Sequence, residues 1–171
     1  MTPTLTALVL LGLSFGGKKK EDAPTGPDPA AVAAEEAEAC AKDIDPERPL
    51  TEQGREDIER LAGFLGRAGI EVERVIHSGK LRAAQTADLL AAAVAPVVEL
   101  ETSDCINPND DPRAFDWQQA TGGQDTLVVG HLPFMSRLVS LLVAEDPDRP
   151  MMAYQPGSVV CLERDSGGRW Q

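Results

Sequence analysis

The chain has 171 residues, 42% of them hydrophobic, which is enough for one globular domain with a core of its own. Its formal net charge is −12. An acidic surface repels nucleic-acid phosphates and anionic lipids, so we expect no nucleic-acid partner and no membrane partner. The three cysteines Cys40, Cys105 and Cys161 form no C-x-x-C pair. They indicate neither a disulfide framework nor a zinc site, and a reducing, cytoplasmic location is expected.

The first thirty residues differ in character from the rest. The stretch MTPTLTALVLLGLSFG is apolar from Leu5 to Phe15, but it is short for a membrane helix and has no positive residues before it. Residues 17–30 are rich in Gly, Pro and charge, as in a linker. We expect residues 1–30 to be an atypical N-terminal segment and 31–171 to form the domain. A secreted or lipid-surface protein is an alternative, and it predicts a mature chain that starts beyond residue 20.

Strands and helices are predicted to alternate along the remaining sequence. Residues 31–42 should be helical if ordered, and Thr51 is a plausible N-cap of a helix that ends at Gly69. Further along, apolar runs and helical spacing predict a strand at 72–78, a helix at 80–94, a possible strand at 97–100, a short helix within 111–122, a strand at 126–130, a helix from about Phe134, a strand at 157–164 and a turn at 165–168.

This order predicts a three-layer α/β domain with a mainly parallel sheet and helices on both faces. Ligands of such sheets bind at the carboxyl ends of strands. His77-Ser78 and Gly130-His131 both lie at predicted strand ends. The sequence contains no G-x-G-x-x-G motif and no P-loop, so nothing supports a nucleotide-binding fold.

Two side chains have the chemistry of an anion site. His131 precedes a predicted helix N-terminus, where an imidazole could contact an anion or act as an acid or base. A histidine satisfied by a backbone carbonyl is the alternative. Arg82 lies in the first turn of a helix, a position that the helix dipole disfavours for a cation unless an anion also binds there. A solvated arginine is the alternative for Arg82. Arg48 is a further, weaker candidate.

A pair between His77 and Ser78 is not expected, because adjacent strand residues point to opposite faces. His77 is therefore interpreted as a local residue or as one at the rim of a substrate site.

Taken together, these motifs resemble the histidine phosphatase superfamily, which has the phosphoglycerate mutase-like fold. They are most similar to its small SixA-type phosphohistidine phosphatases. The matching segments are DPERPLTEQGRED (45–57), VERVIHSGKLRAAQTADLL (72–90), DTLVVGHLPFMSRLVSLL (125–142) and GSVVCLERDSGGRW (157–170).

The resemblance implies roles for individual residues. Arg82 would bind phosphate, His131 would be the second pocket histidine, and the backbone N–H of Leu132 would help to hold the phosphate. Ser78 matches the family's serine at the strand end. Gly79 replaces the usual proline, which is expected to loosen the turn. No metal and no cofactor are implied.

The family's nucleophile is a histidine in an Arg-His pair that ends the opening strand. By the count back from Arg48, Glu36 occupies the nucleophile position, preceded by Glu35, and residues 31–34 replace the strand. The opening strand is therefore expected to be degenerate or missing, although LTALVLLGLSF upstream could substitute for it without supplying a histidine. Two interpretations stay open: a frameshift or misassigned start, or a degenerate pseudo-phosphatase.

The predicted function is hydrolysis of a phosphoryl group from protein phosphohistidine, with little activity in the chain as written. The alternative is a non-catalytic module that binds a phosphorylated ligand through Arg82 and His131. Glu99 and Glu101 lie in the region where larger relatives carry a general acid, but neither is assigned that role.

Overall fold

A computed structural model describes residues 7–10, 46–155 and 157–171. Its five strands form one sheet in the order β3-β2-β4-β1-β5. The first four strands are mutually parallel, and β5 runs antiparallel to β1 at the edge. The mainly parallel sheet predicted from the sequence is therefore confirmed. The strands are β1 (Ala7–Leu10), β2 (Arg74–His77), β3 (Leu100–Thr102), β4 (Thr126–Val129) and β5 (Val159–Leu162).

The N-terminal strand corrects one expectation. The sequence predicts that this strand is degenerate or missing, with residues 31–34 in its place. The structure forms β1 from Ala7–Leu10, paired with β4 on one side and β5 on the other. This strand lies in the upstream run LTALVLLGLSF, which the sequence offered as a substitute. The physical reason is that a short apolar run can form a buried strand wherever two neighbouring strands satisfy its backbone groups. The expected helix at 31–42 lies outside the described residues.

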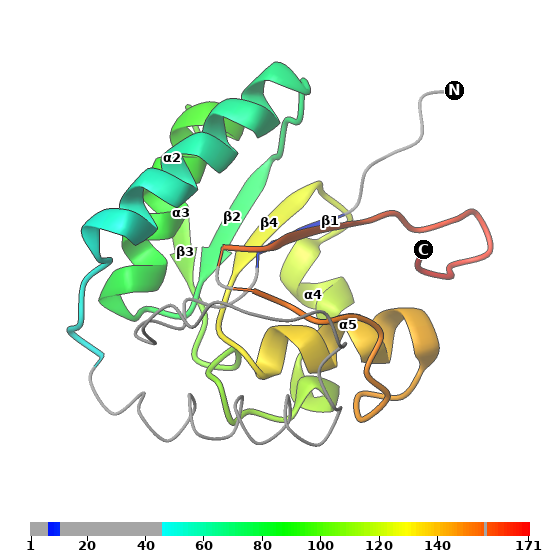
Figure 1. Cartoon of the computed structure of the whole chain (residues 1–171). Coiled ribbons are helices and arrows are strands. Elements are labelled where there is room, and N and C mark those ends of the chain that lie inside the picture. The colour runs from blue at the N-terminus through cyan, green and yellow to red at the C-terminus, as the bar shows by residue number, and fades with distance from the viewer. Residues whose placement is uncertain (1–6, 11–45, 156) are drawn as a thin grey trace, which may run out of the picture.

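Helices cover both faces of this sheet, as Figure 1 shows. One face carries the pair α2 and α3, and the other carries α4 and α5, so the three-layer prediction is also confirmed. The helices are α2 (Glu52–Arg67), α3 (Leu81–Val94), α4 (Trp117–Thr121) and α5 (Phe134–Ala144), with a 3-10 helix η1 (Pro112–Ala114) before α4.

Alternation along the central strands divides the core in two. Val75 and Leu127 pack in a cluster with α2 and α3, whereas their neighbours Ile76 and Val128 pack with α4 and α5. Successive strand residues point to opposite faces, and here both faces are apolar. At about 25 cal/mol per Å² of apolar surface removed from water, the burial of these side chains is the main force that holds the layers together.

The start and end of α2 follow from local chemistry. The Thr51 hydroxyl accepts a hydrogen bond from the Gly54 N–H and caps the first turn, as predicted. Gly69 has a φ of +70° just beyond the helix, in the left-handed region that glycine adopts without a Cβ clash. These two positions set the bounds of the helix that packs against α3.

One predicted strand is displaced. The apolar run at 97–100 was expected to form a strand, but β3 begins at Leu100. Val98 donates its backbone N–H to the Ala95 carbonyl in a turn, and the Val97 side chain is 93% exposed. A turn that contains Pro96 and Val97 therefore takes the place of the first part of the predicted strand. The chain joins the edge of the sheet only at Leu100.

Candidate functional site

The carboxyl ends of β2 and β4 lie side by side, because His77 pairs in register with Val129. Ser78 follows the first strand end and His131 follows the second. The Ser78 hydroxyl and the Nε2 atom of His131 are 2.6 Å apart, which is hydrogen-bond distance. This contact joins residues 53 positions apart and defines the centre of the candidate site.

His131 is held as a neutral imidazole. Its side chain is 2% exposed, and burial lowers its pKa from 6.5 to about 3, with further lowering by the positive charges of Arg82 and Lys80. Burial disfavours the charged form because the interior cannot solvate it, and nearby cations add repulsion. His131 is thus close enough to both cations to be affected by their charge.

Arg82 is the second residue of α3 and is also 2% exposed. Burial lowers the pKa of its guanidinium. A guanidinium remains protonated at neutral pH even so, and its planar fork is suited to paired hydrogen bonds with anionic oxygens. Arg82 thus lies in the first turn of α3, as the sequence predicts, and it is buried there.

The segment that contains Arg48 lies against α3. The N–H of Leu81, the first residue of α3, donates to the Pro46 carbonyl at 2.9 Å, and the Leu50 N–H donates to the Gln85 side-chain oxygen at 2.8 Å. These two bonds bring the R-P-L-T motif to the helix that carries Arg82. Arg48 itself is exposed.

Leu132 lies between His131 and the N-terminus of α5. Its side chain is half-buried, and the first turn of α5 is fixed to the strand end by the Met135 N–H, which donates to the His131 carbonyl at 3.0 Å. The N-terminal end of a helix carries a partial positive charge. The helix therefore adds to the positive field around His131.

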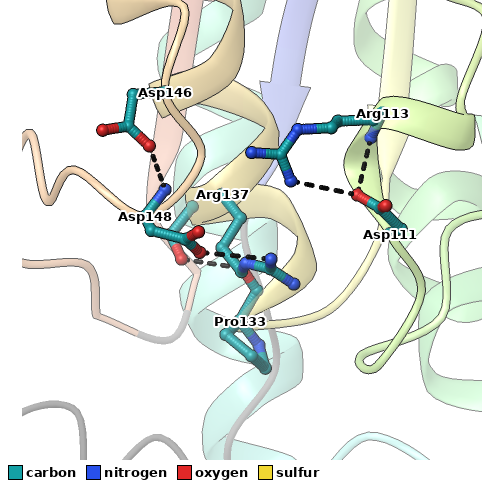
Figure 2. A network of polar contacts seen from close by, with 7 residues as sticks. Asp111, Arg113, Pro133, Arg137, Asp146 and Asp148 are labelled. Atoms are coloured by element: carbon teal, nitrogen blue, oxygen red, sulfur yellow. Dashed lines mark hydrogen bonds and ion pairs between the residues drawn. The ribbon is translucent and has the colours of Figure 1, made fainter.

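Salt-bridged arginines lie beside the start of α5, as Figure 2 shows. Arg137 donates to an Asp148 carboxylate oxygen at 3.2 Å, and its backbone N–H donates to the Pro133 carbonyl. Arg113 of η1 is paired with Asp111. Arg137 and Arg113 each have a carboxylate beside them. The charges that lower the pKa of His131 are those of Arg82 and Lys80.

His77 makes a different contact from its neighbour Ser78. Its Nδ1 atom accepts a hydrogen bond of 3.1 Å from the Gly79 N–H, and burial lowers its pKa. The serine hydroxyl is bonded to His131 instead, as expected if adjacent side chains point to opposite faces.

Gly79 corrects the expectation of a loosened turn. Its φ is +77°, which proline cannot adopt, and its N–H, which proline lacks, holds the His77 ring. Glycine therefore forms a specific turn here.

Of the four glutamates considered in the sequence, the structure describes Glu99 and Glu101. Glu35 and Glu36 lie outside the described residues. Glu101 is paired with Arg74, whose Nε donates to it at 2.9 Å, and this hydrogen bond lowers the pKa of Glu101. A carboxylate held ionised is a poor proton donor. Glu99 is exposed.

Other features of the described chain lie apart from these residues. A pocket of about 550 Å³ lies at the far end of α5 from His131, where Trp170 and Arg169 are among its lining residues. In the described ranges no group of three His, Cys, Asp or Glu side chains could hold a metal ion. No helix in that part of the chain is of a kind that could span a lipid bilayer.

Sequence reasoning selected Arg82 and His131, which are both buried in the structure, but it missed the bond between Ser78 and His131. The available signal was that Ser78 directly follows a predicted strand and that His131 follows another after one glycine. Adjacent strands bring their ends together, but the order β2-β4 is not evident from the sequence, because β3 lies between them along the chain.

Comparison with known proteins agrees with the sequence motifs. A family model described as the histidine phosphatase superfamily (branch 1) matches residues 34–107, a range that includes Ser78 and Arg82. Comparison with curated proteins gives no match.

Several solved structures share the fold. A protein histidine phosphatase SixA complexed with tungstate is 22% identical, with a TM-score of 0.68 over 96% of this chain and 92% of that one. A putative phosphohistidine phosphatase SixA from Agrobacterium tumefaciens is 18% identical, with a TM-score of 0.64 over 98% and 94%. A phosphoglycerate mutase from Plasmodium falciparum is 17% identical, with a TM-score of 0.50 over 98% and 89%. These likenesses show a phosphoglycerate mutase-like fold.

The family model confirms that the sequence resembles the histidine phosphatase superfamily. The solved structures confirm that the fold resembles that of SixA-type proteins.

Proposed function

We propose that this protein is a phosphohistidine phosphatase-like protein that binds a phosphoryl group between Arg82 and His131. The observation that carries the proposal is the joint burial of these side chains at adjacent element ends, close enough for the guanidinium charge to lower the pKa of the imidazole. A guanidinium and an imidazole N–H both donate hydrogen bonds to phosphoryl oxygens, and here the two groups lie at neighbouring element ends.

Each group has a defined task in this proposal. The guanidinium of Arg82 forms paired hydrogen bonds with two phosphoryl oxygens, for which its planar fork is suited. The imidazole of His131 donates to a third oxygen. The Leu132 N–H and the dipole of α5 add a further attraction for negative charge. Neither a metal nor a cofactor takes part.

The proposed substrate is phosphohistidine on a protein partner. This choice rests on the resemblance to SixA-type proteins, which are named as histidine or phosphohistidine phosphatases. The proposed location is the cytoplasm, for which three widely spaced cysteines and an acidic surface are suitable.

Turnover is expected to be small. The family mechanism needs a histidine nucleophile, and the whole sequence contains two histidines, neither preceded by arginine. His77 bonds to its own turn, and His131 bonds to Ser78. This pattern favours a second candidate function, a non-catalytic module that binds a phosphorylated ligand through the same two residues.

Binding and turnover can be measured on the same purified chain. We expect it to bind a phosphohistidine-bearing protein and to release phosphate at a rate far below that of an enzyme. Arg82→Ala should weaken binding at least tenfold, since it removes a charged hydrogen-bonding pair. Arg60→Ala is the matched control, because Arg60 is exposed on α2.

Equal binding by the Arg82→Ala and Arg60→Ala variants would refute the proposed site. Rapid phosphate release that His131→Ala abolishes would refute the expectation of low activity and leave the phosphatase function in place.

A further inference from the structure

The hydrogen bond between Ser78 and His131 can run in two directions. Ser78 is 5% exposed and His131 is 2% exposed, so water does not satisfy what the protein leaves unpaired. A neutral imidazole has one ring nitrogen that donates and one that accepts, and a hydroxyl can do either. The low pKa of His131 means that the ring is neutral at physiological pH.

Counting donors and acceptors separates the two directions. The Nδ1 atom of His131 is buried and has no hydrogen-bond partner among the described residues. If Nε2–H donated to Ser78, two groups would be unpaired: the hydroxyl hydrogen and the bare Nδ1. If the hydroxyl donates to Nε2, only Nδ1–H is unpaired. A buried unpaired polar group is destabilising, so the second direction is favoured.

We infer that Ser78 is a positioning residue that donates to Nε2 of His131 and thereby fixes the imidazole with its hydrogen on Nδ1. The side chain does not itself react. It determines which ring nitrogen of His131 presents an N–H from within the buried site.

This assignment makes the histidine a donor to the ligand, and in this respect it rests on the proposed function. The oxygens of a phosphoryl dianion only accept hydrogen bonds, so a bare ring nitrogen would repel them, whereas an N–H attracts them. The Nδ1–H of His131, which has no partner among the described residues, is then the donor assigned to a phosphoryl oxygen. Arg82 supplies the positive charge nearby.

The second histidine provides an internal reference. The Nδ1 atom of His77 accepts from the Gly79 N–H, so His77 must carry its hydrogen on Nε2 when neutral. The two histidines of the chain are therefore assigned opposite tautomers. A measurement that distinguishes tautomers will show both forms in one sample.

The test uses nitrogen NMR of the full chain labelled with ¹⁵N-histidine at pH 7. Two rings contribute, and a His77→Asn variant assigns them. We expect a protonated Nδ1 in His131 and a protonated Nε2 in His77. This comparison requires no change at Ser78, so it stands even if variants at that position fail to fold.

Variants at Ser78 then test the cause. In Ser78→Ala the His131 signal should move toward the Nε2–H form, while the His77 signal should not. Inorganic phosphate should bind about tenfold more weakly, as expected for loss of one hydrogen bond to a charged group. Ser78→Thr keeps the hydroxyl and should restore both properties, a rescue that a merely structural role would not produce.

Specific outcomes would overturn the inference. They are an Nε2–H form of His131 in the unaltered chain, an unchanged tautomer in Ser78→Ala, or a phosphoryl group bound covalently to Ser78 after incubation with a phosphohistidine protein. Failure of the proposed function has a different signature, in which His131 shows the Nδ1–H form but neither phosphate nor the phosphoprotein binds.

Discussion

The ends of β2 and β4 are neighbours in the sheet, and each carries one of the two histidines. At the end of β2, His77 bonds to the backbone of Gly79, two residues away. At the end of β4, His131 bonds to a side chain 53 residues away and lies in the field of Arg82 and Lys80. The same residue type thus supports a local turn in one place and forms part of a polar site in the other. The difference comes from the groups next to each ring: a backbone N–H beside His77, and a serine hydroxyl and two cations beside His131.

Gly130 separates β4 from His131, and its substitution should have the largest effect on stability. A Cβ at Gly130 would lie 2.4 Å from the sulfur of Met135, a fully buried side chain. We expect Gly130→Ala to lower the free energy of unfolding by about 1–3 kcal/mol through overpacking, measured by urea denaturation.

Gly66→Ala is the control for Gly130→Ala. Gly66 lies within α2, where a Cβ would make only ordinary contacts, and alanine should raise stability by about 0.5–1 kcal/mol. Equal effects of the two substitutions would show that the strand end is not tightly packed.

The pH dependence of stability compares the two histidines directly. The folded pKa of His131 is lowered to about 3 from an unfolded value near 6.5, so the unfolded chain binds the proton more readily. Its contribution to stability is fully present above pH 6.5 and is lost as the pH falls toward 3. Between pH 7 and pH 5 the loss from this group should be about 2 kcal/mol.

Denaturation curves over this pH range provide the measurement. His131→Asn should remove most of the slope, and His77→Asn should retain the part due to His131. If His131→Asn kept the slope of the unaltered chain, the histidine would not be held neutral by the fold.

A substitution at Gly79 tests the turn at the end of β2 that holds His77. Its expected effect on stability is smaller than that of Gly130→Ala. Its φ of +77° lies in the left-handed region, so Gly79→Ala should cost about 1 kcal/mol. The Cβ would also approach the Thr102 methyl at 3.0 Å. Thermal unfolding measures the cost, and the His77 nitrogen signal shows whether the turn is retained. A stabilising effect would contradict the assigned turn.

The smallest effect is expected at β3, next to β2. Glu101 pairs with Arg74, but its side chain is 45% exposed, so solvent screens the interaction. Glu101→Gln should lower stability by less than about 1 kcal/mol, measured by thermal unfolding against Glu99→Gln. A large loss would mean that the pair fixes the position of β2.

Much of the fold can be predicted from the sequence, because its signals are local. Thr51 caps α2 through a residue three positions away, and Gly69 ends it by its own conformation. The apolar residues Val75-Ile76 of β2 and Leu127-Val128-Val129 of β4 indicate strands buried on both faces. Arg82 and His131 could be selected because both lie at the boundaries of such elements.

The position of β1 was not predictable in the same way. A run of four apolar residues is compatible with many environments, and the partners that satisfy its backbone are β4 and β5, more than a hundred residues along the chain. Residues 31–34, which the count from Arg48 places at the opening strand, lie outside the described residues.

By itself, the sequence determined the alternation of strands and helices, the acidic charge, and the placement of Arg82 and His131 at element ends. Only the tertiary structure decided that β2 lies beside β4, that Ser78 reaches Nε2 of His131, and that Gly79 holds His77. The physical reason is that caps and periodicity depend on residues within one or two turns. Strand order, burial and the partner of a ring nitrogen depend on the whole folded chain.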